Sequence, residues 1–388
     1  MTDKKSSETK NHKSKKTIMQ VVPTLIAGGV ERGTIEIANA IIQNGDRSIV
    51  VSAGGPLISK IHDVGAEHFK MNVATKNPIS MYCNIDNIAQ IIKDESVDIV
   101  HARSRAPAWS SYYAAKQTGA KFMTTFHGVY NFSCGLKKYY NSIMLSGERV
   151  IAVSHFVRDH ILANYDVDES KIRVVHRGVD YRYFDPKRMT DEIYAKFREK
   201  YHIPKSVPVI VLPARMTRWK GQAALIKALN LIKDKDFYCI ISGDLAKHPT
   251  YTCEIRDMIH EFKMQRKIQL FGPESDMVGL YGIADIVLST SIEPEAFGRV
   301  AIEGQAMEKI VIATNIGGAV ETVTDEVNGY HVKPGDEREL ATKIAYVLDN
   351  LDSKDLDNMR KKARKCAIEN FSVDTMDKKT MAVYAELM

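Results

Sequence analysis

Residues 284–303 read ADIVLSTSIEPEAFGRVAIE, and this stretch predicts a strand, a polar turn and a helix in that order. The run ADIVLST is short, mostly apolar and followed by turn residues, as expected of a strand inside a parallel sheet. The helix is expected to begin near Gly298 and to end near Met307. A strand that leads into a helix is the repeating unit of α/β folds, so we expect parallel strands here.

The same alternation of short β-rich runs and longer amphipathic stretches extends in both directions along the chain. Residues 30–45 form one such amphipathic stretch, which Gly45 ends. We therefore expect two doubly wound sheets. The first would contain strands 17–23, 48–53, 67–71, 97–102, 121–126, 149–153 and 172–176, and the second strands 207–213, 237–242, 267–271, 284–290, 309–314 and 329–332.

A polar stretch at residues 178–208 interrupts this alternation. It contains Asp185-Pro186 and Ile203-Pro204, which punctuate the chain rather than build a core. The two α/β domains would face each other across a cleft, where a ligand is expected. We divide the chain into a disordered basic tail (1–16), an N-terminal Rossmann-like domain (17–180), a linker (181–206), a C-terminal Rossmann-like domain (207–370) and a helix (371–388) that packs back on the N-terminal domain.

The composition is that of a globular protein, with 388 residues of which 44% are hydrophobic and 26% charged. We find neither a long apolar run nor a hydrophobic signal after the basic N-terminus, which disfavours a spanning helix and a secretory signal. The 5 cysteines form no CxxC pair, so a reducing cytoplasm is expected. Most of the net charge of +6 comes from lysines in residues 1–16. This tail is either a solvated arm or a contact to an anionic membrane, and nucleic acid is not an expected partner.

Two glutamates flank the turn of the opening stretch. Glu295 lies before the helix and Glu303 more than one turn inside it, so the two carboxylates are separated by roughly 10 Å along the axis. They cannot form one acid/base pair, but they suit the two ends of an elongated polar ligand. The first backbone N–H groups of the helix, at Phe297, Gly298 and Arg299, would point at a phosphate between them.

A second polar turn, PARMTRWKG at residues 213–221, follows the first strand of the C-terminal domain. Arg215 offers a planar fork and Lys220 a mobile point charge, and the next helix adds its positive N-terminal dipole. Such a turn can grip a diphosphate, although a merely exposed charged turn is the alternative.

Two turns of the N-terminal domain carry further candidates. Gly28-Gly29 lies between the first strand and its helix, where it allows either a tight turn or close approach of a ligand to the backbone. The run GGVERGT is not GxGxxG and has no P-loop lysine, so a dehydrogenase or P-loop kinase is poorly supported. His127, in Phe-His-Gly after strand 121–126, is either a structural residue or a group at the ligand-binding edge of the sheet.

The run HARSRAP at residues 101–107 ends another strand of this domain. Its basic side chains, His101, Arg103 and Arg105, would either line the same cleft as His127 or form a solvated loop.

Together, GGVERG, FHG, the Arg-x4-Lys-Gly run and EPEAFGRVAIE resemble the retaining glycosyltransferases of family four, which have the GT-B fold. The resemblance spans nearly the whole chain from Thr17, and the motifs stand in the order of the family. HRGVDYRYFDP corresponds to the linker of the family, with Arg177 in place of the usual Asn. The resemblance implies a catalytic set of His127, Glu295, Arg215 and Lys220 and a donor-binding set of Gly28, Gly29, Gly243, Gly272, Pro273, Phe297, Gly298, Arg299 and Glu303.

Within these sets, the resemblance assigns Arg215 and Lys220 to the donor diphosphate and Glu303 to the ribose. Glu295 and the amides near Phe297 would hold the donor sugar, with His127 beside its reactive carbon. The C-terminal domain would bind the nucleotide sugar and the N-terminal domain the acceptor. No metal is implied, and the Asp-x-Asp triplets of this chain fall in predicted loops or helix starts, where solvated charge is expected.

The function implied is transfer of a hexose from a UDP- or GDP-sugar to a glycan or lipid-linked acceptor, with retention, in cell-envelope glycan or lipopolysaccharide synthesis. Two alternatives stay open: a glucan synthase or phosphorylase-like enzyme of the same fold, and an inactive nucleotide-sugar-binding protein. The expected location is cytoplasmic, at the inner face of the membrane. Residues 137–145 form either an ordinary amphipathic helix or a second contact to a bilayer.

Overall fold

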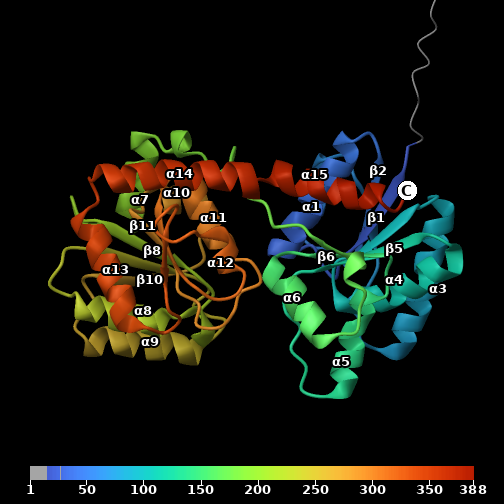
Figure 1. Cartoon of the computed structure of the whole chain (residues 1–388), viewed down its shortest axis with the longest axis horizontal. Coiled ribbons are helices and arrows are strands. Elements are labelled where there is room, and N and C mark those ends of the chain that lie inside the picture. The colour runs from blue at the N-terminus through green and yellow to red at the C-terminus, as the bar shows by residue number, and fades with distance from the viewer. Residues whose placement is uncertain (1–14, 27) are drawn as a thin grey trace, which may run out of the picture. The chain divides into compact units, whose positions relative to one another are not determined.

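The computed structural model describes residues 15–26 and 28–388, and these form two compact units (Figure 1). The first unit consists of the described residues up to Thr125 together with Phe132–Val150 and Thr380–Met388. The second unit consists of Phe126–Asn131 and Ile151–Lys379. Most of the predicted basic tail, residues 1–14, lies outside the described residues.

The first parallel sheet has seven strands in the order β3-β2-β1-β4-β5-β6-β7, which confirms the seven strands predicted for this half of the chain. Met19 of β1 lies opposite Ile49 of β2 and Val100 of β4. All three side chains are fully buried, as in parallel sheets covered on both faces. The strands are β1 (Thr17–Val21), β2 (Arg47–Ser52), β3 (Glu67–Lys70), β4 (Ile99–Ala102), β5 (Lys121–Phe126), β6 (Arg149–Ala152) and β7 (Ile172–Val174).

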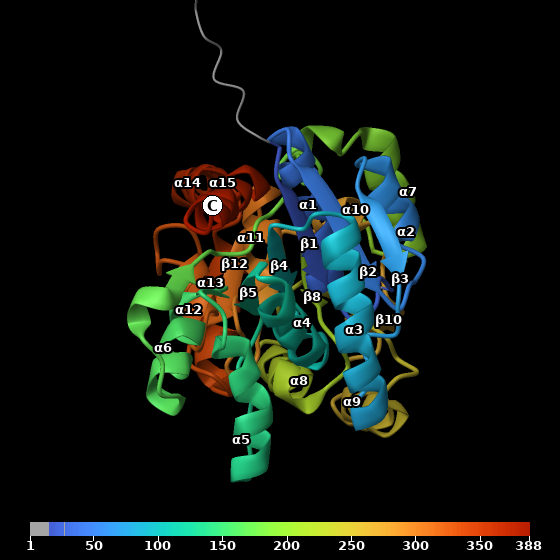
Figure 2. The ribbon, with the colours of Figure 1, turned by 90° about the vertical axis from the view of Figure 1, so that its right-hand side faces the viewer.

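The helices between these strands are amphipathic. The predicted helix at 30–45 is present as α1, with Ile37, Ala38 and Ile41 on its buried face. Helices α1 and α4 pack on the strands, and α3 packs along α4 (Figure 2). The helices are α1 (Gly29–Gln43), α2 (Ile58–Asp63), α3 (Pro78–Asp94), α4 (Arg105–Thr118), α5 (Gly135–Ser142) and α6 (His155–Asn164), with single 3-10 turns η1 (Ile143–Leu145) and η2 (Glu169–Lys171).

The second sheet has six parallel strands in the order β10-β9-β8-β11-β12-β13, and all six were predicted. The strand order reverses between the neighbouring strands β8 and β11. In open α/β sheets, ligands bind outside the carboxyl ends of the strands at such a switch point. The strands are β8 (Val209–Pro213), β9 (Tyr238–Ser242), β10 (Ile268–Phe271), β11 (Ile286–Ser289), β12 (Ile310–Thr314) and β13 (Tyr330–Val332).

Alternate residues of β8 enter two different apolar cores. Ile210 and Leu212 join the core beneath α8, α9 and α13, whereas Val209 and Val211 join the core beneath α7, α10 and α11. Both faces of the second sheet are therefore covered. The helices of this half are η3 (Pro186–Arg188), α7 (Asp191–Lys200), η4 (Arg218–Lys220), α8 (Gln222–Leu231), α9 (Pro249–Glu261), α10 (Met277–Gly282), α11 (Arg299–Ala306), α12 (Ala319–Thr322), α13 (Glu337–Asp349), α14 (Lys354–Phe371) and α15 (Val373–Ala385).

The end of α15 packs in the first unit and covers His101, which is fully buried. One ring nitrogen of His101 lies 2.7 Å from the hydroxyl of Tyr384, and the other lies 2.7 Å from that of Thr125. Arg103 is also buried and donates to Gln20. Because both side chains are buried, neither His101 nor Arg103 lines an open cleft or a solvated loop, and both hypotheses are wrong for these two residues.

Burial, followed by the nearby charge of Arg103, holds the pKa of His101 well below its usual value. The unfolded chain therefore takes up a proton near pH 6.5 that the folded chain does not, so stability is lost as the pH falls below this value. We expect His101→Gln to reduce the slope of unfolding free energy against pH, between pH 6.5 and 5, by up to about 1.4 kcal/mol per pH unit.

Urea unfolding at a series of pH values measures this slope. Tyr384→Phe is the matched control, because it removes the hydroxyl partner but keeps the imidazole and so should keep the slope. An unchanged slope in His101→Gln would show that another group carries the pH dependence.

No helix among the described residues combines the length and the apolar composition needed to cross a bilayer.

Candidate functional site

The turns that follow β8 and β11 are joined at the switch point of the second sheet. Gly221 ends the first turn with a φ of 75°, and a Cβ at this position would lie 2.0 Å from the carbonyl oxygen of Thr290. Only glycine permits so close an approach. The Thr290 hydroxyl donates to the carbonyl of Lys220 (3.2 Å), and the amide of Ile292 donates to that of Trp219 (2.8 Å). These contacts hold the two predicted motifs side by side.

The joined turns bring Lys220 and Glu295 into an ion pair. The Lys220 Nζ lies 2.6 Å from a Glu295 carboxylate oxygen, and both side chains are largely shielded from water. The hydroxyl of Ser291 donates to the same oxygen of Glu295. Burial lowers the pKa of Lys220 despite the attraction of Glu295. Two candidate residues from separate motifs therefore meet, and their charges compensate each other.

Trp219 organises the cations of the first turn. The Arg215 guanidinium lies 5.2 Å and the Lys220 ammonium 4.3 Å from the centre of its ring, within the range of cation–π attraction. Arg218 instead pairs with Glu254 at 2.6 Å. Arg215 is exposed. The exposed guanidinium and the shielded ammonium are thus held near each other by one aromatic ring.

Helix α11 begins directly after the turn that carries Glu295. Gly298 precedes the helix with a φ of 83°, and no side chain caps the first turn. The side chain of Phe297 is buried in the core, so only its backbone is placed to meet a ligand. Arg299 starts the helix. The amide of Ala301 donates to the Gly298 carbonyl at 3.2 Å, whereas the amides before it lie ahead of the intrahelical bonds, which makes them suitable for an anion.

Glu303 lies on α11, where its side chain is buried and hydrogen-bonded. The Tyr281 hydroxyl donates to it at 2.9 Å, and the Arg299 guanidinium lies 3.4 Å away. Tyr281 could not be predicted as part of the site, since a tyrosine in an apolar helix carries no signal of this role. A carboxylate held in this way keeps acceptor sites for further hydroxyl groups.

Three further candidates follow the ends of β9 and β10. A Cβ on Gly243 would lie 2.1 Å from the carbonyl oxygen of Ala214, so the end of β9 packs closely on the turn that contains Arg215. The Ser242 hydroxyl donates to the carbonyl of Gly272 at 2.9 Å. Gly272 and Pro273 are exposed. These residues therefore border the turns of the switch point.

The remaining candidates lie in two places. His127 is half-buried and belongs to the second unit, where a Cβ on its neighbour Gly128 would contact the Ala296 side chain at 3.9 Å. Gly28 and Gly29 belong to the first unit, where Gly28 precedes α1 with a φ of 134°. The structure thus brings the Phe-His-Gly turn beside the residue that follows Glu295.

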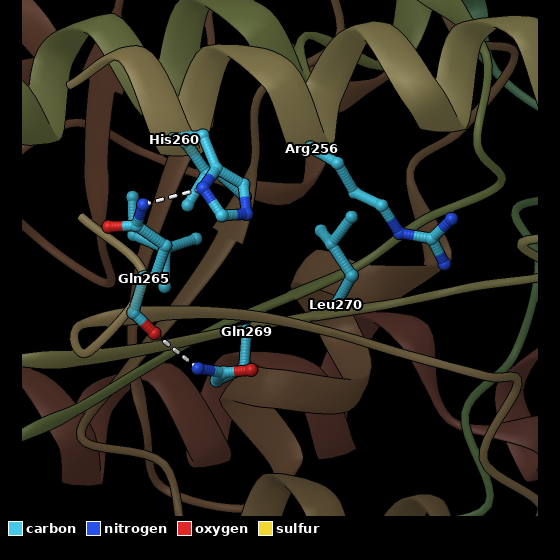
Figure 3. Close-up of a pocket in the computed structure, with 7 residues that line it drawn as sticks. Arg256, His260, Gln265, Gln269 and Leu270 are labelled. Atoms are coloured by element: carbon cyan, nitrogen blue, oxygen red, sulfur yellow. Dashed lines mark hydrogen bonds between the residues drawn. The ribbon is translucent and has the colours of Figure 1, made fainter. Parts of the chain in front are cut away.

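Two other features were not predicted. A pocket of about 170 Å³ between α9 and β10 is lined by Arg256, His260, Gln265 and their neighbours and includes no predicted site residue (Figure 3). Within residues 15–26 and 28–388, one group has the donor set of a metal site: the potential ligand atoms of His155, His176 and Glu321 lie within 4.8 Å of one another.

Two family models cover most of the chain. Glycosyl transferases group 1 matches residues 194–366, and Glycosyltransferase Family 4 matches residues 27–183.

Similar proteins and structures agree with these matches. A crystal structure of a glycosyltransferase from Rickettsia africae ESF-5 is 51% identical, with a TM-score of 0.91 over 97% of this chain and 99% of that one. HepE from Anabaena, in complex with UDP and glucose, is 22% identical, with a TM-score of 0.84 over 96% of this chain and 100% of that one. The N,N'-diacetylbacillosaminyl-diphospho-undecaprenol alpha-1,3-N-acetylgalactosaminyltransferase of Campylobacter jejuni is 22% identical over 86% of this chain and 89% of its own length. With the two Rossmann-like sheets, these findings confirm the predicted GT-B fold class.

Proposed function

The chain belongs to the glycosyl transferases of group 1, and from this premise we propose that it moves a hexose from a nucleoside-diphosphate sugar to an acceptor hydroxyl with retention of configuration. The observation that carries the proposal is the meeting of Lys220 and Glu295 at the switch point of the second sheet. The two joined turns carry Lys220, Glu295 and the start of α11. The ammonium and the helix N-terminus suit the charges of such a donor, and the carboxylate suits its hydroxyls.

In the proposed reaction the bond between the anomeric carbon and the diphosphate breaks, and a bond to the acceptor oxygen forms on the same face. The acceptor proton passes to an oxygen of the leaving phosphate, so no protein carboxylate acts as a nucleophile. Negative charge grows on the diphosphate in the transition state. Arg215, Lys220 and the first turn of α11 stabilise this charge, and preorganised groups of this kind supply the largest catalytic effect.

To bind between Lys220 and Glu295, the donor must replace each partner of their ion pair with a contact of its own. A diphosphate competes with Glu295 for the Lys220 ammonium, while the hydroxyl groups of the sugar take up the Glu295 carboxylate. Phosphate and sugar together therefore replace both halves of the pair, whereas a free nucleoside diphosphate replaces only one. The pair favours the intact donor over the product.

We also propose that transfer needs no metal ion, because Arg215 and Lys220 supply the positive charge that a metal would otherwise bring to the diphosphate. Chelation with EDTA should therefore leave turnover unchanged.

The proposed acceptor is a lipid-linked or envelope glycan, as in lipopolysaccharide synthesis, reached at an anionic membrane from the cytoplasmic side. The name of the Campylobacter relative describes transfer to an undecaprenol-linked sugar. In the first unit, α5 projects from the strands and exposes 82% of Leu136 and 64% of Tyr139 beside Lys137 and Lys138 (Figures 1 and 2). Apolar side chains among lysines suit a bilayer surface.

A cluster of aromatic rings on α4 and α5 lies beside these exposed residues of α5. Trp109 lies 5.5 Å from Tyr139 and 6.4 Å from Tyr113 between ring centres, and Ser110 donates to the backbone of Met81. That contact places the start of α3, with its exposed Ile79 and Tyr82, next to α4.

Co-sedimentation with anionic liposomes tests the contact. We expect Leu136→Ser with Tyr139→Ser to reduce binding at low and high salt, since burial of apolar area does not depend on salt. Removal of residues 1–14, which keeps the ion pair of Lys16 with Asp98, should reduce only the salt-sensitive part and leave turnover in solution unchanged, because lysines contribute through a screened charge of about 1 kcal/mol each. The control is Leu231→Ser, which changes an exposed leucine of α8. Equal binding by all variants would refute the membrane contact.

The experiment that tests the proposed function is a panel of UDP- and GDP-sugars, measured first by thermal shift and then by transfer. A donor at 100 times its dissociation constant should stabilise the protein by about 2.7 kcal/mol. The anomeric configuration of the product, determined by NMR, tests retention. Use of glucan acceptors would favour the synthase or phosphorylase hypothesis. Binding without turnover would favour an inactive binding protein, and no binding of any donor would overturn the proposal.

A further inference from the structure

The loop that carries Glu295 is hydrogen-bonded to the turn after β12 and packs closely against it. The amide of Gly318 donates to the Glu295 carbonyl at 2.7 Å, and a Cβ on Gly318 would lie 2.3 Å from the Ala296 carbonyl oxygen. A Cβ on Gly317 would lie 2.6 Å from the Glu295 carbonyl oxygen. The donor loop, residues 293–298, is therefore bonded to this turn and packed closely on it, and α12 begins directly after the turn.

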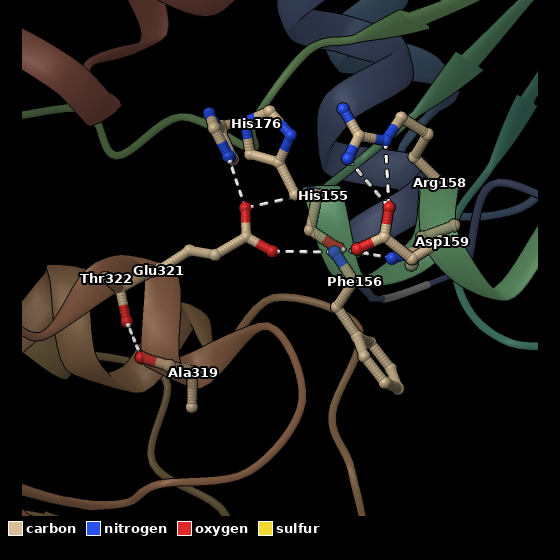
Figure 4. Close-up of polar contacts among 10 residues, drawn as sticks. His155, Phe156, Arg158, Asp159, His176, Ala319, Glu321 and Thr322 are labelled. Atoms are coloured by element: carbon tan, nitrogen blue, oxygen red, sulfur yellow. Dashed lines mark hydrogen bonds and ion pairs between the residues drawn. The ribbon is translucent and has the colours of Figure 1, made fainter. Parts of the chain in front are cut away.

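Glu321 anchors α12 to the start of α6 (Figure 4). One of its carboxylate oxygens accepts the amide of Phe156 at 2.8 Å, and the other accepts that of His155 at 2.9 Å. The Nε2 of His176 lies 2.7 Å from the second oxygen. Burial alone would raise the pKa of Glu321, but the hydrogen bonds from His176 and the two amides outweigh it and lower the pKa. Glu321 is therefore an ionised and well-bonded anchor.

His176 connects the same anchor to the donor loop. Its ring lies 5.7 Å from that of Phe297 within the loop and 5.4 Å from that of Phe371 at the end of α14. Because a carboxylate only accepts hydrogen bonds, the Nε2 of His176 carries a proton and donates to Glu321. A neutral imidazole can do this as well as a charged one. One side chain thus touches both the support of the loop and the loop itself.

A metal site is the other use that this cluster suggests, and the bonding pattern does not favour it. Both oxygens of Glu321 already accept backbone amides, and the separation of 2.7 Å from His176 is that of a direct hydrogen bond. The amides also belong to a helix N-terminus, whose positive dipole opposes a cation. The imidazole of His155, which a metal would need, is exposed and contacts the ring of His176 only edge-on, at 5.5 Å between ring centres, whereas its backbone amide bonds to Glu321.

We infer that Glu321 and His176 form a positioning pair, which holds the donor loop so that Glu295 and the first amides of α11 meet the sugar of the donor. The inference rests on the proposed function and adds to it two residues that touch no substrate. Loss of the pair leaves Glu303 with its own partner Tyr281 and leaves the core of α11 intact. The nucleotide end of the site should therefore survive when the sugar end becomes misplaced.

Four variants test the pair. His176→Ala and Glu321→Gln remove the hydrogen bonds to the anchor or weaken them, and His176→Gln offers a replacement donor. His155→Ala is the matched control, because it removes an imidazole of the same cluster but keeps the backbone amide. We expect His176→Ala and Glu321→Gln to lower kcat by roughly 10- to 100-fold, since a small misplacement at a reacting centre costs this much. The dissociation constant for UDP or GDP should change less than threefold.

The other two variants separate positioning from metal binding. His176→Gln should recover most of the lost kcat, and His155→Ala should be close to the wild type. If His155→Ala lowered kcat as much as His176→Ala, or if Zn²⁺ added to EDTA-treated protein raised the activity of the wild type but not of His155→Ala, the positioning pair would be wrong and a metal site would replace it. Nucleotide affinity that fell together with kcat would also overturn it.

A readout without turnover keeps this inference distinct from the proposed function. Hydrogen exchange should become faster in the peptide that covers residues 293–298 in His176→Ala and Glu321→Gln, but not in His155→Ala. Unchanged exchange in all variants would overturn the inference even if transfer were found. Faster exchange in a protein that uses no sugar donor would overturn the proposed function and leave the support of the loop in place.

Discussion

Lys220→Ala should reduce sugar transfer by on the order of 100-fold or more. The Lys220 ammonium is held at the site by the ring of Trp219, and the sugar hydroxyls that take up Glu295 release it to stabilise the charge that grows on the leaving diphosphate. One such group at a developing anion contributes roughly 3–4 kcal/mol to the transition state. The variant should still fold, because Glu295 keeps the hydrogen bond from Ser291. Initial rates at saturating donor measure the effect.

The matched control for this prediction is Lys227→Ala. Lys227 lies on α8, the helix that begins just after Gly221, and it pairs with Glu337 at 2.9 Å with half of its side chain exposed. The control removes the same charge from the helix that follows the Lys220 turn, without touching the site. Near-native rates in Lys220→Ala, or an equal loss in Lys227→Ala, would contradict the role of Lys220 at the diphosphate.

Glu303→Ala and Glu295→Ala should separate nucleotide binding from sugar binding. A carboxylate that accepts hydroxyl hydrogen bonds from a ribose contributes on the order of 1.5–3 kcal/mol, so Glu303→Ala should weaken nucleoside diphosphate binding by about 10- to 150-fold. Glu295→Ala should spare the nucleoside diphosphate, since it removes the competitor for Lys220, and should damage only the binding and transfer of the intact donor.

Calorimetry with the nucleoside diphosphate and with the intact donor measures both effects. Glu303→Gln is needed beside Glu303→Ala, because it keeps an acceptor for the buried Tyr281 hydroxyl. Glu293→Gln, two residues before Glu295 and exposed, is the control for a charge change in the same loop. Equal losses for both ligands in both variants would show that the two glutamates do not divide the donor between them.

Local patterns were sufficient for the elements of both sheets. Every predicted strand is present, and the helix at 30–45 differs only at its ends. The reason is that the two kinds of element have different patterns of apolar residues. A strand inside a parallel sheet is a short apolar run, whereas an amphipathic helix has apolar residues at intervals of three to four positions. The same patterns place the Lys220 and Glu295 turns after strands, at the edge of the sheet where ligands bind.

Partners far apart in the chain could not be predicted in the same way. His101 lies near the carboxyl end of β4, as a ligand-binding residue could, yet it is buried against Tyr384, which lies 283 residues away. Tyr281 and Glu303, or His176 and Glu321, carry no shared pattern that pairs them. Polar side chains of this kind are buried only because a distant segment supplies the hydrogen bond that offsets the loss of water.

The sequence by itself determined the two Rossmann-like sheets, the order of the motifs and their position on strand-to-helix turns, because these features depend on local periodicity and on the residues that end each element. Only the tertiary structure decided that Lys220 neutralises Glu295 and that the turn after β12 is bonded to the loop that carries Glu295. Both contacts require β8 to lie beside β11 and β12 beside β11. That adjacency is set by the burial of whole sheet faces, which no single segment encodes.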